Sequence, residues 1–234
     1  MELSNPALAQ LYTIPTAHWT AINRRVGAVL LMADIAGTVV QDLPGFTELE
    51  AACQAWSAST FQDLAEYARH LDDYAAEAIA LFQPLQEQLA ALPPGPLPDS
   101  FRQEASDALW HLQTATLPLT SGMAALSAAV ATFMQLNQQV DARLMQYQQS
   151  VPGWASLSRE TAAIDEASGL VNGAWQSLAD SLTYVLHDID ISAPWLESLN
   201  IDLAIQTWAN IQTEARAFAS QAGDQQKYWT SPLT

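Results

Sequence analysis

"TELEAACQAWSASTFQDLAEYARHLDDYAAEAIALFQPLQEQLAAL" (47–92) contains no glycine, and its apolar side chains recur every three or four residues. That spacing is typical of one face of an amphipathic α-helix. We therefore predict one continuous helix over 47–92, about 69 Å long at 1.5 Å per residue. The predicted apolar stripe consists of Leu49, Cys53, Trp56, Thr60, Leu64, Tyr67, Leu71, Tyr74, Ala78, Phe82, Leu85 and Leu89.

Proline-containing breakers separate this segment from others with the same periodicity. They are "DLPGF" (42–46), "LPPGPLPDS" (92–100), "SVPGWASLS" (150–158) and "DIDISAPW" (188–195). Between them we expect helices at about 17–41, 47–92, 100–149, 156–190 and 196–222. Helices joined by short loops pack as antiparallel neighbours. The predicted fold is all-α: a single elongated antiparallel bundle of about five helices over residues 1–234, two or three of them very long.

Composition narrows the function classes. The chain has 8 basic and 25 acidic residues, a net charge of -17. Such a surface repels phosphate backbones, so no nucleic-acid partner is expected. Cys53 is the only cysteine, which excludes an intramolecular disulfide and a cysteine-rich zinc site.

The stretch "RRVGAVLLMADIAGTVV" (24–40) is compatible with a signal peptide, a membrane span or a core helix. It starts late for a signal peptide, and its apolar run stops at Asp34, short of the roughly 20 residues of a membrane helix. We interpret it as a core helix and keep entry into lipid as the alternative. The candidate membrane-insertion residues are Val26, Val29, Leu30, Leu31, Met32, Ile35, Val39 and Val40. A second candidate segment is the alanine-rich Met123–Met134.

The sequence gives no sign of catalysis. None of the four histidines has a glutamate three residues before it, as the metal sites of helical bundles require. A nucleophile elbow, a glycine-rich phosphate loop and a cysteine–histidine pair are also absent from the sequence. We expect no catalytic residue, no metal, no other cofactor and no small-molecule substrate, and the protein is not expected to be an enzyme.

Eight tryptophans form two groups. Those inside the helical segments are expected in the core: Trp56, Trp110, Trp175 and Trp208. Those near predicted helix ends are candidate interface aromatics, with closure of the bundle ends as the alternative: Trp19, Trp154, Trp195 and Trp229.

The order of the helices resembles that of a known toxin group. "LEAACQAWSASTFQDLAEYARHLDDYAAEAIALFQPLQEQL" (49–89) is similar to the second long helix of the α-helical pore-forming toxins, the Bacillus haemolytic enterotoxins and xenorhabdolysin-type cytolysins. "SFRQEASDALWHLQTATLPLTSGMAALSAAVATFMQLNQQVDARL" (100–144) resembles the helix that follows it. "GAWQSLADSL" (173–182) and "AIQTWANIQTEARAF" (204–218) look like the two C-terminal helices.

The chain departs from that group at one point. The toxins carry a head with an apolar tongue between the third and fourth long helices, where this chain has only "SVPGWASLS" (150–158). The resemblance therefore implies a component of a multi-protein pore-forming cytolysin, whose expected partners are other cytolysin subunits and a lipid membrane. The alternative is a non-toxic intracellular helical adaptor or chaperone-like binding protein. If it is a toxin component, we expect secretion without a recognisable N-terminal signal peptide and a soluble form before any membrane binding.

Overall fold

The computed structural model describes residues 3–35, 44–93, 96–146, 157–187 and 200–230. Every regular element in these ranges is helical, and none of them contains a strand, so the prediction of an all-α bundle is confirmed. The longer helices are α1 (Thr16–Ile35), α3 (Phe46–Ala55), α4 (Phe61–Ala91), α5 (Asp99–Gln146), α6 (Leu157–His187) and α8 (Ile201–Gln225). The shorter elements are the 3₁₀-helix η1 (Pro6–Ala9), the π-helical turn η2 (Trp56–Thr60) and α9 (Lys227–Thr230).

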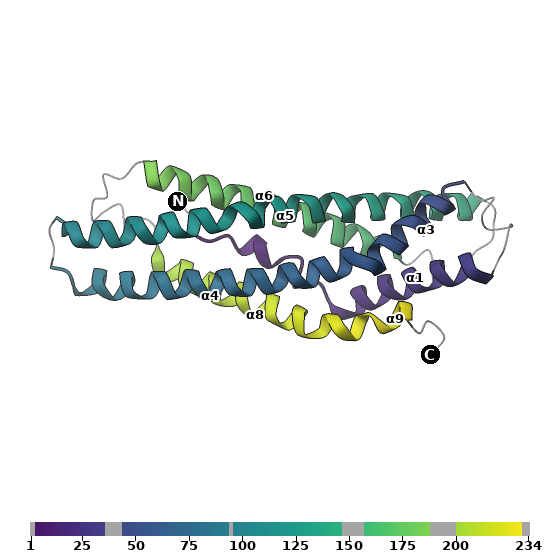
Figure 1. Cartoon of the computed structure of the whole chain (residues 1–234), viewed down its shortest axis with the longest axis horizontal. Helices are drawn as coiled ribbons and strands as arrows, with labels where there is room; N and C mark the ends of the chain where they lie inside the picture. Colours follow the sequence, from purple (N-terminus) through teal and green to yellow (C-terminus); the bar gives the residue numbers. More distant parts are fainter. Residues whose placement is uncertain (1–2, 36–43, 94–95, 147–156, 188–199, 231–234) are drawn as a thin grey trace.

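The bundle is elongated along α5 (Figure 1), whose 48 residues correspond to about 72 Å. In one half, α4 lies between α5 and α8, and α5 packs against α6. In the other half, α1 packs against α3, α6 and α9, while α3 packs against α5.

The apolar stripe of the 47–92 segment faces the core. All its residues from Leu49 to Leu85 are buried, and Leu89 is half-buried. This continuous seam packs against α5 and α8, and its burial contributes hydrophobic stabilisation to the bundle.

Trp110, which we expected in the core, is instead exposed, and so are Leu170 and Leu203. In each case a neighbour in the sequence occupies the core position: Leu109, Val171 and Ala204, respectively. One residue corresponds to about 100° around a helix, so a small error in the register of a stripe turns a side chain from the core to solvent.

The predicted continuous helix over 47–92 is interrupted by η2. There the N–H of Phe61 donates to the carbonyl of Trp56, five residues earlier, in place of the α-helical spacing of four. The Ser59 and Thr60 hydroxyls both donate to the carbonyl of Ala55, at 3.3 and 3.4 Å. The wider turn brings both Trp56 and Phe61 into the core, although they are five residues apart.

The N-terminal segment forms part of the core, which we did not predict. Residues around η1 lie between α6 and α8, and Leu3, Leu8, Leu11 and Tyr12 are buried there. The Trp208 Nε1–H donates to the Leu3 carbonyl at 3.0 Å. Asn5 followed by a proline is a helix-start signal in the sequence, and the Asn5 side chain does accept the Ala7 N–H at 3.0 Å.

Candidate functional site

The predicted membrane-insertion segment lies largely in α1 and faces the protein interior. Val26 and Val29 are fully buried, while Leu30 and Leu31 are half-buried. Met32 and Ile35 belong to α1, but the structure does not describe their side chains. Val39 and Val40 lie outside the described residues. The described part of the segment therefore has the position of a core helix.

Buried polar contacts hold α1 in this position. The fully buried Asn23 accepts the Trp56 Nε1–H at 2.9 Å and donates to Gln225 Oε1 at 3.4 Å. The buried Arg25 donates through Nε to Asn137 Oδ1 at 2.6 Å. These bonds connect α1 to η2, α8 and α5, and each would leave a buried polar group unsatisfied if α1 moved away.

Of the four candidate interface aromatics, Trp19 and Trp229 are described and pack inside the bundle. Trp19 is 2% exposed and lies with its ring centroid 5.1 Å from that of Phe218. Trp229 is half-buried, 5.5 Å from the ring of Phe61. Trp154 and Trp195 lie outside the described residues. In this conformation the two described indoles cover apolar rings of the chain itself.

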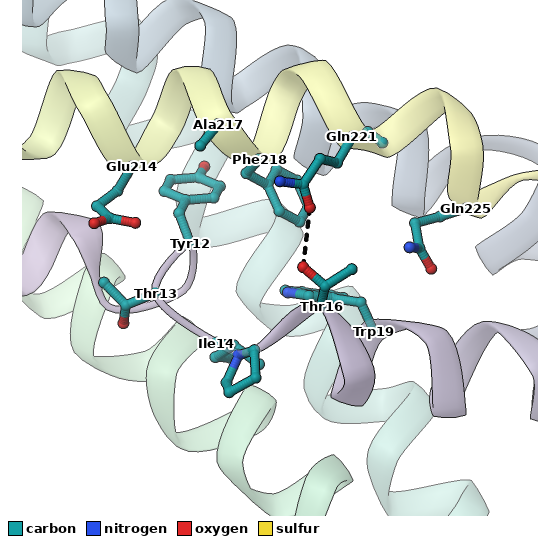
Figure 2. A pocket seen from close by; sticks show the side chains of 12 residues that line it. Tyr12, Thr13, Ile14, Thr16, Trp19, Glu214, Ala217, Phe218, Gln221 and Gln225 are labelled. Carbon is teal, nitrogen blue, oxygen red and sulfur yellow. Dashed lines mark hydrogen bonds between the residues drawn. The ribbon is translucent and has the colours of Figure 1, made fainter.

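A small cavity of about 220 Å³ lies between the 12–16 segment and α8. Figure 2 shows Tyr12 and Phe218 on one side of it and the Thr16 hydroxyl, which donates to Gln221 Oε1 at 2.9 Å, on another. The Trp19 Nε1 at its edge is buried and has no hydrogen-bond partner among the described residues. The volume is below the roughly 300 Å³ at which small-molecule sites usually begin, and one water molecule would satisfy the indole N–H.

The exposed side of α5 combines a lack of charged residues with exposed apolar side chains. The sequence from Ala108 to Val140 contains no Asp, Glu, Lys or Arg, although the whole chain carries a net charge of -17. Among the described helices, the Asp99–Val140 part of α5 is the one long and apolar enough to cross a membrane, with a mean hydropathy of 1.5 over 18 residues, of which 33% are buried. Trp110 and Leu117, seven residues apart, are 62% and 59% exposed on it.

Beside this surface, α4 and α5 border a groove. Two hollows of about 420 and 400 Å³ follow one another between the helices and share His70. We call the α4 side the acidic wall, formed by Asp63, Glu66, Asp73 and Glu77 together with His70. We call the α5 side the apolar wall, formed by Ala115, Pro118, Leu119, Gly122, Ala125, Leu126 and Ala129.

Two tyrosines from α4 form the floor of the groove. The Tyr67 hydroxyl donates to the Leu119 carbonyl at 2.8 Å, and the Tyr74 hydroxyl donates to the Leu112 carbonyl at 3.3 Å. Burial raises the pKa of both phenols well above the ordinary value of 10, so both stay protonated donors at neutral pH. These bonds attach α4 to α5 across the groove.

Among the described residues there is neither a cluster of metal ligands nor an exposed thiol. No group of three or more His, Cys, Asp or Glu side chains among them could hold a metal ion. Cys53 is fully buried, and burial raises the pKa of its thiol to about 12, which makes it a poor nucleophile. The candidate functional sites are therefore two binding surfaces: the uncharged side of α5 and the groove beside it.

Comparison with known proteins places the chain in no group: no family model, no curated protein and no solved structure matches it. Sequence reasoning had singled out Met123–Met134, which lies within the uncharged stretch of α5. It missed the groove, because the acidic wall and the apolar wall lie on different helices and meet only in the folded bundle.

Proposed function

We propose that the protein is a component of a multi-protein α-helical pore-forming cytolysin, which assembles through its helices with partner subunits and with a membrane. One observation carries the proposal: α5 is uncharged from Ala108 to Val140, yet two thirds of its most apolar 18-residue window is not buried. A core helix of a soluble protein passes the same hydropathy test, but it is mostly buried. The exposure of α5 favours a surface that is covered by lipid or by another subunit.

Within this proposal α5 replaces α1 as the segment that engages the membrane. Moving α1 into lipid would break the bonds of Asn23 and Arg25 and uncover the buried Val26 and Val29. The outer side of α5 can contact lipid or a partner with no change in the fold. The exposed Trp110 lies near one end of the uncharged stretch, where an indole suits the interface between lipid and water.

The test uses vesicles of neutral phosphatidylcholine, because anionic lipid would repel a chain of net charge -17. The full chain, alone and with the proteins encoded beside it, is assayed for co-flotation and for release of an entrapped dye. The Ala128→Asp variant places a charge at an exposed position of α5, and Ala209→Asp makes the same change at an exposed position of α8. Since an aspartate inside lipid costs about 2.5–3.5 kcal/mol, we expect Ala128→Asp to weaken membrane association by roughly 100-fold and Ala209→Asp to leave it unchanged.

Absence of flotation and leakage in every combination would contradict the proposal, as would equal effects of the two variants. The second candidate function is a helical adaptor or chaperone-like protein that does not act on membranes. The groove between α4 and α5 favours it, because such a groove suits a peptide better than lipid. Helix binding without any response to vesicles would support the adaptor.

A further inference from the structure

The groove between α4 and α5 combines two chemically different walls, one acidic and one apolar. Along the acidic wall, the carboxylates are spaced three, seven and four residues apart from Asp63 to Glu77, so they form one row about 21 Å long. The apolar wall bears small residues, including Gly122, Ala125 and Ala129, which leave room for another backbone to approach closely. A complementary ligand therefore needs a positive side and an adjoining apolar side.

The groove is already formed in this structure. The hydrogen bonds of Tyr67 and Tyr74 to the α5 backbone fix its floor. Near the Glu77 end, the carboxylate of Glu77 lies 2.7 Å from His111 Nε2 and joins the two helices. A ligand would pay little conformational cost in the protein, because both walls are held by regular helices.

Two of the four acidic-wall carboxylates pair with histidines: Glu66 lies 4.0 Å from His70 Nε2, and Glu77 lies 2.7 Å from His111 Nε2. Among the described residues, Asp63 and Asp73 have no ion-pair partner, whereas the neighbouring Asp72 forms a two-bond pair with Arg216 at 3.0 and 2.8 Å. Like charges three or four residues apart weaken a helix slightly, so this row has an energetic cost in the free protein. A row of cations on a ligand would offset that cost.

We propose that this groove binds an amphipathic helix of a partner protein that carries Lys or Arg along one side and small or branched apolar residues along the adjoining side. A second copy of this chain does not fit, because its eight basic residues are spread over six helices and form no row. Helix-in-groove binding of this kind relies on apolar anchors at helical spacing, with charge setting orientation. This binding rests on the assembly function proposed above and specifies the chemistry of the partner. The groove binds the partner helix without any lipid present.

The test measures binding of the full chain to a fluorescein-labelled synthetic helix in lipid-free buffer by anisotropy. The probe has about 18 residues, or about 27 Å of helix, with lysines placed to face the acidic wall and leucine and alanine beside them. A peptide of the same composition with lysines on all sides is the ligand control. Salt is raised from about 50 to about 300 mM, because exposed ion pairs weaken on screening.

Two pairs of variants locate the site. Glu66→Lys with Asp73→Lys reverses charges on the acidic wall, and Glu166→Lys with Asp180→Lys makes the same net change on exposed positions of α6. Ala125→Trp fills the groove, whereas Ala128→Trp adds the same bulk on the outer side of α5. We expect at least about tenfold weaker binding for the first member of each pair and less than about twofold change for the second.

The proposal is overturned if the amphipathic peptide does not bind better than its control, or if the members of either pair have equal effects. Self-association of the chain that the peptide reverses would assign the groove to a second copy and would also overturn it. Because no vesicle is present, failure of the membrane assay leaves this result unaffected. Peptide binding with the expected variant pattern, in turn, supports the groove whichever of the two functions holds.

Discussion

Replacing Gly27 with alanine tests how closely α9 packs on α1. A Cβ atom at Gly27 would lie 2.1 Å from the carbonyl oxygen of Tyr228, and such atoms essentially never come closer than 3.0 Å. The backbone of α9 would therefore have to move by about 1 Å. That movement disturbs the Arg24 guanidinium, 5.1 Å from the Tyr228 ring, and the contact of Trp229 with Phe61.

The magnitude follows from a comparison with Gly173→Ala. Gly173 lies in α6 with nothing within 4 Å of its virtual Cβ, so that variant reports only the helix preference of alanine over glycine. Both variants gain this preference, about 0.5–1 kcal/mol of added stability. In Gly27→Ala, overpacking against Tyr228 also lowers the stability by about 1–3 kcal/mol. We expect Gly27→Ala to unfold at a Tm lower than that of Gly173→Ala by roughly 2–12 °C, given about 2–4 °C per kcal/mol at this chain length.

Thermal unfolding followed by circular dichroism measures the difference, and proteolysis locates it. Lys227, the first residue of α9, is the only lysine in the chain, so a lysine-specific protease reports opening at this point. We expect faster cleavage of Gly27→Ala than of either the parent or Gly173→Ala. Equal melting temperatures and equal cleavage rates for the two variants would refute the close packing of α9 on Gly27.

Three further predictions concern single residues. Cys53, whose thiol pKa is raised to about 12 by burial, should react with a disulfide reagent at about pH 8 only after denaturant is added, and fast native reaction would contradict its burial. The Arg216 side chain lowers the pKa of Asp72 below its ordinary value of 3.8, so the stabilisation is present above that value and is lost as pH falls through the lowered pKa. Asp72→Asn should therefore reduce the drop in urea midpoint between about pH 6 and about pH 3, and an unchanged drop would exclude this pair as a contributor. Leu11→Ala should destabilise the protein by about 2–5 kcal/mol in urea unfolding, whereas the exposed Leu203→Ala should change stability by less than about 0.5 kcal/mol; similar values would contradict the buried N-terminal segment.

The sequence was sufficient to predict helices and their approximate limits. Runs without glycine, apolar residues every three or four positions and proline-rich breakers are local properties. The helix limits predicted from them lie within about five residues of the observed ones wherever the structure describes them, and the largest difference is the start of α8 at Ile201 rather than at about 196. The same periodicity identified the buried face of α4. It did not predict η2, because the wider turn is selected by the need to bury both Trp56 and Phe61 in one core.

Tertiary structure decided which apolar surfaces are covered. By composition, the segment starting at Arg24 and the middle of α5 were both candidates for contact with lipid, and only their packing in the bundle distinguishes them. Asn23 and Arg25 of α1 have hydrogen-bond partners inside the bundle, whereas Trp110 and Leu117 of α5 are exposed. The groove arose in the same way, since a carboxylate row on one helix acquires an apolar opposite wall only when another helix lies beside it. Helix formation depends on neighbours in the sequence, whereas burial depends on which helices meet, and that is set by the packing of the whole chain.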